Sequence, residues 1–71
     1  MINLRDQILK NQITYYNGLI AKHHQNVEIY LNQPVCIGEH SDVMGTIDGE
    51  INAIAQAHEK IEIINHYFLN R

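Results

Sequence analysis

A single proline, Pro34, stands almost at the midpoint of the 71-residue chain. Proline lacks a backbone N–H and disfavours helical geometry in the residue before it, so a helix ends at or before that point. On both sides of Pro34 the apolar residues recur at spacings of three and four, which indicates helices with one buried face. The sequence therefore predicts one domain over residues 1–71, with a helix at about 3–32, a loop at about 33–41 and a helix at about 42–70.

Both predicted helices carry a heptad-like apolar stripe, which favours the packing of a left-handed coiled coil. The first stripe contains Ile2, Leu9, Ile13, Tyr16, Ile20, His23, Val27 and Tyr30. The second contains Met44, Ile47, Ile51, Ile54, His58, Ile61, Asn65 and Phe68. Facing residues of an antiparallel hairpin have numbers with a constant sum, and a sum of 74 joins these stripes, as in Tyr30 with Met44. We expect an all-α fold, an antiparallel two-helix hairpin.

Polar residues stand where each helix is expected to begin. Asn3 is a good N-cap for the first helix, and Asp6 follows three residues later in the manner of a capping box. Ser41 is the expected N-cap of the second helix, where the carboxylate of Asp42 also complements the positive end of the helix dipole.

The apolar surface of the first helix extends beyond the stripe that would face the second helix. It continues to four residues that we predict to mediate self-association: Leu4, Ile8, Tyr15 and Leu19. A chain of this length buries a modest core, and its one cysteine cannot form an internal disulfide. We therefore expect a homodimer in which two hairpins form a four-helix bundle. A monomer with an exposed apolar flank is the alternative.

Three polar residues fall on the predicted core stripes: His23, His58 and Asn65. Polar residues at such positions set the register and the oligomeric state at some cost in stability. We expect His23 to hydrogen-bond Glu50 and His58 to hydrogen-bond Tyr16. Metal chemistry inside the bundle is less favoured, because the Glu-x-x-His pairs of di-metal bundles do not occur. We predict no cofactor and no metal ion.

The predicted loop and the start of the second helix hold the candidate partner-binding residues: Val35, Cys36, Ile37, Gly38, Glu39, His40, Gly45 and Gly49. Loops on rigid scaffolds often carry recognition, although we favour an arrangement in which the apolar loop residues fold back and cover the end of the bundle. The two glycines either allow a close approach by a partner or simply weaken the helix. Cys36, His40 and Asp42 are residue types of a nucleophilic trio, but no oxyanion-hole motif accompanies them, so we do not expect an enzyme.

The charge pattern argues against two classes of partner. Five Lys and Arg residues stand singly along the chain against eight Asp and Glu residues, whereas nucleic-acid binding needs clustered cations. The apolar runs are too short to span a membrane. The first residues lack the pattern of a signal peptide, so we expect a cytoplasmic protein that binds neither nucleic acid nor membrane.

The turn at residues 32–42 and its flanking helices resemble small uncharacterised helical-hairpin proteins of contractile-tailed phages that infect marine cyanobacteria. The resemblance covers most of the chain and is strongest at Pro34 and residues 37–42. It implies expression in the cytoplasm of a bacterial host and a small accessory or virion-associated role. It implies no activity and no catalytic residue.

These observations favour a small non-enzymatic protein-interaction module, acting as an adaptor, regulator or inhibitor of an unknown protein partner. The alternative is a structural or assembly component, which the phage resemblance would suit. A metal-binding helical bundle is the third and least favoured function.

Overall fold

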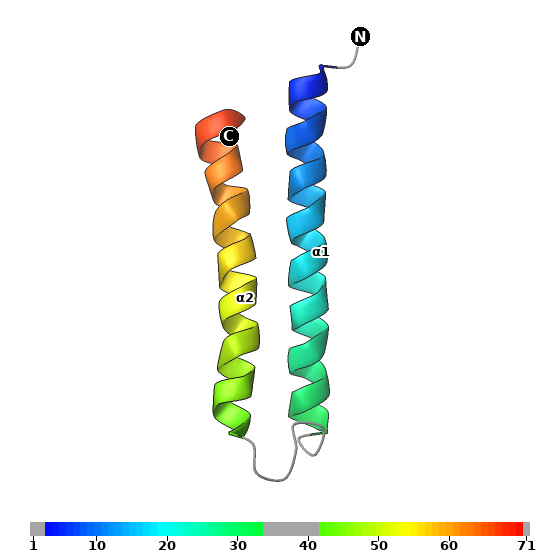
Figure 1. Ribbon diagram of the computed structural model, residues 1–71, viewed down its shortest axis with the longest axis vertical. Helices are drawn as coiled ribbons and strands as arrows, with labels where there is room; N and C mark the ends of the chain where they lie inside the picture. The colour runs from blue at the N-terminus through cyan, green and yellow to red at the C-terminus, as the bar shows by residue number, and fades with distance from the viewer. Residues whose placement is uncertain (1–2, 34–41, 71) are drawn as a thin grey trace.

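The computed structural model describes residues 3–33 and 42–70 and has the predicted all-α hairpin (Figure 1). Helix α1 spans Leu4–Asn32 and helix α2 spans Val43–Ile63. A short π-helix, η2, continues α2 over Ile64–Phe68. The two helices run antiparallel along a molecule of 55 × 19 × 14 Å, and the described residues contain no strand.

Asn3 caps the first turn of α1, as predicted. Its side-chain oxygen accepts hydrogen bonds from the backbone N–H groups of Arg5 at 2.9 Å and Asp6 at 3.4 Å. These donors have no partner within the helix, so the cap removes part of the cost of starting it. The Asp6 carboxylate pairs with the Arg5 guanidinium at 3.2 Å and also lies near the positive end of the helix dipole.

The N-cap of α2 is Asp42, which corrects the prediction of Ser41. Ser41 itself lies outside the described residues. The Asp42 carboxylate accepts a hydrogen bond from the Gly45 N–H at 3.0 Å. A carboxylate satisfies this free donor and complements the helix dipole at once, which a hydroxyl does only in part. A Cβ at position 45 would lie 2.5 Å from Asp42 Oδ2, so the glycine leaves room for the cap.

The inner face of α1 is the predicted stripe. Its described members are all partly buried: Leu9, Ile13, Tyr16, Ile20, His23, Val27 and Tyr30. The remaining member, Ile2, lies outside the described residues. The period of three and four was therefore sufficient to identify which side of this helix meets α2.

Only half of the stripe predicted on α2 lies on the face of the helix that packs against α1. Ile47, Ile54 and Ile61 are partly buried as expected. The other half of the stripe is exposed, with Met44 at 80% and Ile51 at 50%. Helix α2 is rotated relative to the predicted setting. Four residues that each precede a member of the predicted stripe by one position face α1: Val43, Glu50, Ala57 and Ile64.

The contact between His23 and Glu50 shows the corrected register. Their numbers add up to 73, one less than the predicted constant of 74. The same register brings Tyr16 level with Ala57, which is 2% exposed. A methyl group opposite a large ring leaves space for the ring in this layer, so the register with a sum of 73 suits the sizes of these two side chains.

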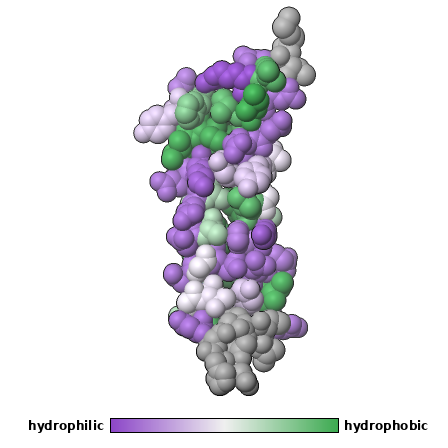
Figure 2. All heavy atoms as spheres, in the orientation of Figure 1, coloured by the Kyte–Doolittle hydropathy of each residue, from purple (hydrophilic) through white to green (hydrophobic). Residues whose placement is uncertain are grey.

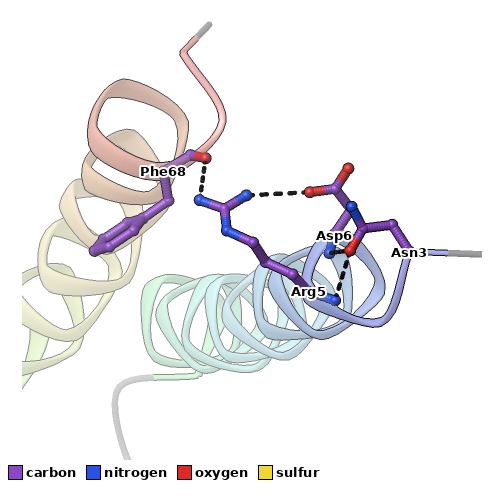
Figure 3. A network of polar contacts seen from close by, with 4 residues as sticks. All are labelled: Asn3, Arg5, Asp6 and Phe68. Atoms are coloured by element: carbon purple, nitrogen blue, oxygen red, sulfur yellow. Dashed lines mark hydrogen bonds and ion pairs between the residues drawn. The ribbon is translucent and has the colours of Figure 1, made fainter.

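The last turn of the hairpin is a π-helix, closed by the hydrogen bond from Leu69 N to Ile64 O at 3.0 Å. Arg5 ties this turn to the start of α1, because its guanidinium donates to the Phe68 carbonyl at 2.8 Å (Figure 3). Carbonyls at a helix end have no partner within the helix, and a cation also complements the negative end of the dipole. The open end of the hairpin is therefore held by a polar clip.

Candidate interaction surface

The hairpin buries very little of its apolar surface. Among the described residues only Ala57 and Ile64 are buried, at 2% and 7% exposed. Ten large apolar side chains in the same part of the chain are exposed: Leu4, Ile8, Tyr15, Ile29, Leu31, Met44, Ile51, Ile63, Tyr67 and Phe68. An exposed apolar surface of this kind is typical of an interaction site.

The residues predicted to mediate self-association lie on one side of α1, in two pairs separated by Asn11 and Gln12. We name these four residues the outer stripe of α1: Leu4, Ile8, Tyr15 and Leu19. At 100° per residue the four side chains fall within an arc of about 60° on the helix surface. Leu4, Ile8 and Tyr15 are 69%, 56% and 59% exposed, and Leu19 is partly buried. The outer stripe is therefore a mostly exposed apolar surface that lies beside the face of α1 in contact with α2.

The same end of the molecule carries exposed apolar residues of the second helix. Ile63 is 40% exposed and Tyr67 is 69% exposed. In Figure 2 the hydrophobic surface gathers at the end where the start of α1 lies beside η2 and the end of α2, while polar side chains dominate the middle. On the face shown, the hydrophobic surface is therefore concentrated at the open end of the hairpin.

Two aromatic contacts border the outer stripe. The Tyr15 and Tyr16 rings are 5.5 Å apart between centroids, at 55° to one another. Lys60 of α2 places its ammonium 5.7 Å from the centre of the Tyr16 ring, a distance typical of a cation–π contact. This contact of Lys60 was not predicted from the sequence, where the only signal for it is a cation on the flank of α2.

Two shallow depressions lie at the loop end. One is lined by residues of the first turns of α2: Met44, Gly45, Ile47, Asp48 and Ile51. The other is lined by residues of the last turns of α1: Gln25, Glu28, Ile29, Asn32 and Gln33. Both are open, so they suit a surface contact with a protein better than an enclosed small ligand.

The predicted partner-binding residues fall into two groups. Residues 35–40 lie outside the described residues. Gly45 and Gly49 are exposed, and a Cβ on Gly49 would meet no atom within 4 Å. Gly45 lines one of the two depressions, although its small size is explained by the Asp42 cap.

A polar layer crosses the hairpin at His23, Glu50 and Asn26. His23 Nδ1 lies 2.5 Å from Glu50 Oε2, and the Asn26 amide donates to the same oxygen at 3.2 Å. The His23 and Glu50 side chains are 22% and 17% exposed. The hydrogen bond from His23 lowers the pKa of Glu50 below its usual value, partly opposed by burial and reinforced by Asn26. The expected pairing of His23 with Glu50 is confirmed, whereas the contribution of Asn26 was missed.

The predicted role of His58 in the core is wrong. Its side chain is 67% exposed and its Nε2 lies 3.2 Å from Glu62 Oε1, one turn further along α2. The one-residue rotation of α2 puts Ala57 where His58 was expected, so the predicted pair with Tyr16 is not formed. Asn65, the third predicted polar core residue, is partly buried in η2.

The sequence also raised a metal site and a nucleophilic trio, and their residues are placed as follows. No group of three His, Cys, Asp or Glu residues there could hold a metal ion. Of the trio considered above, Cys36 and His40 lie outside that part, and Asp42 is engaged as the cap of α2. No helix over residues 3–33 or 42–70 combines the length and the apolar character that crossing a membrane requires.

The fold and its surface define a class of protein, a small all-α helical hairpin with large exposed apolar side chains. Comparison with protein-family models, with curated proteins and with solved structures finds no match to this chain.

Proposed function

We propose that the protein is a small non-enzymatic protein-interaction module, an adaptor, regulator or inhibitor, built as a homodimer of two hairpins. The observation that carries the proposal is the imbalance between two buried residues, Ala57 and Ile64, and ten exposed large apolar side chains in the described part of the chain. Hydrophobic burial is the main stabilising term in folding, so a hairpin with this imbalance needs another surface to cover it.

The exposed area has the size that such a dimer requires. The chain exposes 5508 Å², whereas a compact monomer of 8.2 kDa exposes about 4,500 Å². The excess of about 1,000 Å² is close to the roughly 800 Å² that each partner loses in a standard interface. Two hairpins that share their apolar faces would form a four-helix bundle of coiled-coil-like packing.

The binding of a second, different protein is assigned to the loop end. The apolar surface at the open end would be covered in the dimer, and the depression lined by Met44, Ile47 and Ile51 would stay accessible. The proposed partner site comprises this depression, its flanking glycines and the predicted loop residues. A cytoplasmic setting is part of the proposal and is supported by the single cysteine of the sequence.

A structural or assembly component, possible for a phage-associated protein, is the second candidate. The 80% exposure of Met44 and the 50% exposure of Ile51 favour it, because these residues give the molecule a second apolar patch away from the outer stripe. Two different apolar patches on one chain can link copies head to tail without closing a ring.

The molar mass in solution distinguishes these functions. Size-exclusion chromatography with light scattering should give twice the chain mass over a hundredfold range of concentration. A mass that keeps increasing with concentration would favour the assembly component. A well-folded monomer at every concentration would exclude the dimer. Once the dimer is established, co-purification of one protein at fixed stoichiometry, lost when Met44 or Ile51 is replaced by glutamate, would support the interaction module.

A further inference from the structure

We propose that two copies of the chain dock antiparallel through the outer stripe of α1, around a two-fold axis that crosses the helix between Asn11 and Gln12. This inference rests on the proposed dimer, because it specifies which surface and which orientation the dimer uses. The occupant of the outer stripe is therefore a second copy of the same surface.

The spacing of the outer stripe is symmetric about its own centre. The numbers of Leu4 and Leu19 add up to 23, and so do those of Ile8 and Tyr15. In an antiparallel helix pair, facing residues have numbers with a constant sum. With a sum of 23, Leu4 faces Leu19 of the second copy, and Ile8 faces its Tyr15. Every apolar residue thus meets an apolar residue, and each contact occurs twice, as a two-fold interface requires.

The centre of the outer stripe is polar but uncharged. Asn11 and Gln12 are exposed and stand on either side of the proposed axis, where Asn11 would face Gln12 of the second copy. Each amide can donate and accept, so this pair can satisfy itself across the axis. One polar layer within an apolar contact is a known means of setting register.

Like charges do not meet in this arrangement. Lys10 lies on the far side of α1 from the outer stripe, because it is about 150° from the centre of the stripe around the helix. Arg5, at the edge of the stripe, is already engaged by the Asp6 carboxylate and the Phe68 carbonyl (Figure 3). A sum of 23 sets Arg5 opposite Gly18, whose surroundings are open to a further side chain.

The position of the apolar surface along the molecule favours this orientation over a parallel one. A parallel dimer would extend the contact along the whole hairpin, including its middle, where hydrophilic side chains surround a smaller hydrophobic patch on the face shown in Figure 2. The antiparallel dimer overlaps only over the first half of α1, where the exposed residues Leu4, Ile8 and Tyr15 are concentrated. It also brings Ile63 and Tyr67, from the same end of the molecule, toward the contact.

A mixing experiment tests the pairing directly. Ile8→Glu and Tyr15→Lys should each raise the dissociation constant of the dimer by about a hundredfold, because the change occurs at two symmetric contacts. An equimolar mixture should recover a dimer containing one chain of each kind, since the new carboxylate would face the new ammonium. Mass spectrometry under native conditions separates this mixed dimer from either homodimer. Leu31→Glu, at an exposed apolar residue outside the stripe, is the matched control and should leave dimerisation unchanged.

Disulfide formation provides a second test that does not depend on weakening the dimer. In a Cys36→Ser background, a mixture of Ile8→Cys and Tyr15→Cys chains should cross-link to each other. Neither should cross-link to itself, because equal positions would be about 10 Å apart along the axis.

The outcomes separate this inference from the proposed function. A wild-type chain that is monomeric at every concentration would exclude both the proposed homodimer and the antiparallel docking through the outer stripe. If the wild-type chain forms a stable dimer and both Ile8→Glu and Tyr15→Lys leave its dissociation constant unchanged, the outer stripe is not the dimer interface. The proposed dimer itself would then still hold. Loss of the dimer in each variant without recovery on mixing, together with no cross-link between positions 8 and 15, would overturn the antiparallel pairing.

Discussion

His23 and Glu50 join the two helices near the middle of the hairpin, with 2.5 Å between His23 Nδ1 and Glu50 Oε2. An ionised carboxylate only accepts hydrogen bonds, so Nδ1 carries the proton in this pair. The amide of Asn26 donates to the same oxygen at 3.2 Å. This layer ties α2 to α1 in one rotational setting, since Glu50 faces α1 only when α2 is turned as observed.

The lowered pKa of Glu50 predicts a loss of stability in acid. The hydrogen bond from His23 lowers this pKa below its ordinary value of 4.5, so the unfolded chain binds the proton more readily than the folded chain. The stabilisation is present above about pH 4.5 and is lost as the pH falls through the folded pKa. Thermal melts followed by circular dichroism from pH 7 to pH 3 should show a steeper fall for wild type than for Glu50→Gln. Parallel curves for the two proteins would contradict this role of Glu50.

Ala57 should tolerate no larger side chain. It is 2% exposed and level with Tyr16, so Ala57→Leu adds volume at a buried position between the helices. Overpacking of this kind costs about 1–3 kcal/mol, which chemical denaturation can measure. Ala55→Leu is the control, because Ala55 is exposed on the same helix and should change stability little. Equal effects at the two positions would show that the contact at Ala57 is looser than described.

The two glycines at the start of α2 should respond differently to alanine. Gly49 has open space around it, so Gly49→Ala should stabilise the helix by up to about 1 kcal/mol. At Gly45 a Cβ would lie 2.5 Å from Asp42 Oδ2, so Gly45→Ala should displace the capping carboxylate and lose most of that gain. Denaturant titrations of both variants, with Asp42→Ala as a reference for loss of the cap, make the comparison. A gain at position 45 that equals the gain at position 49 would argue against the cap as the reason for Gly45.

Removal of the Arg5 guanidinium should loosen η2. Arg5 donates to the Phe68 carbonyl at 2.8 Å, a contact between residues at opposite ends of the chain. In Arg5→Ala, amide hydrogen exchange over residues 66–70 should accelerate, while the middle of both helices keeps its protection. Lys10→Ala is the matched control, because it removes an exposed cation of α1 that has no described contact with η2. Unchanged exchange at residues 66–70 would show that the clip does not hold this turn.

The hairpin could be predicted because its signals are local. Pro34 marks the break between the helices, Asn3 caps the first, and the period of three and four marks the inner face of α1. These features depend on neighbours within a turn or two, which a single sequence contains. The outer stripe was found by the same logic, as apolar residues beyond the width of one contact.

The rotation of α2 could not be predicted, because it depends on contacts between the helices. Met44, Ile51 and His58 form as regular a stripe as the residues that actually face α1. The observed setting places the buried Ala57 level with Tyr16 and joins Glu50 to His23, and both pairs are distant in sequence. The expected bond between His23 and Glu50 already has a sum of 73, which disagrees with the sum of 74 given by the apolar stripes. Glu50 is charged and Ala57 is small, so neither residue is recognised by a pattern of large apolar side chains.

The displacement of the outer stripe toward the open end determines how far apart a dimer would hold its two loop ends. The proposed axis crosses α1 near residue 11, and about 20 residues separate that point from the end of the helix at Asn32. At 1.5 Å per residue each arm would extend about 30 Å beyond the axis, in opposite directions. The dimer would thus be a rigid spacer with its two binding ends about 60 Å apart. Such a spacer would gain avidity only for targets repeated at a matching distance, and it would bind isolated copies of the same target no better than one arm does.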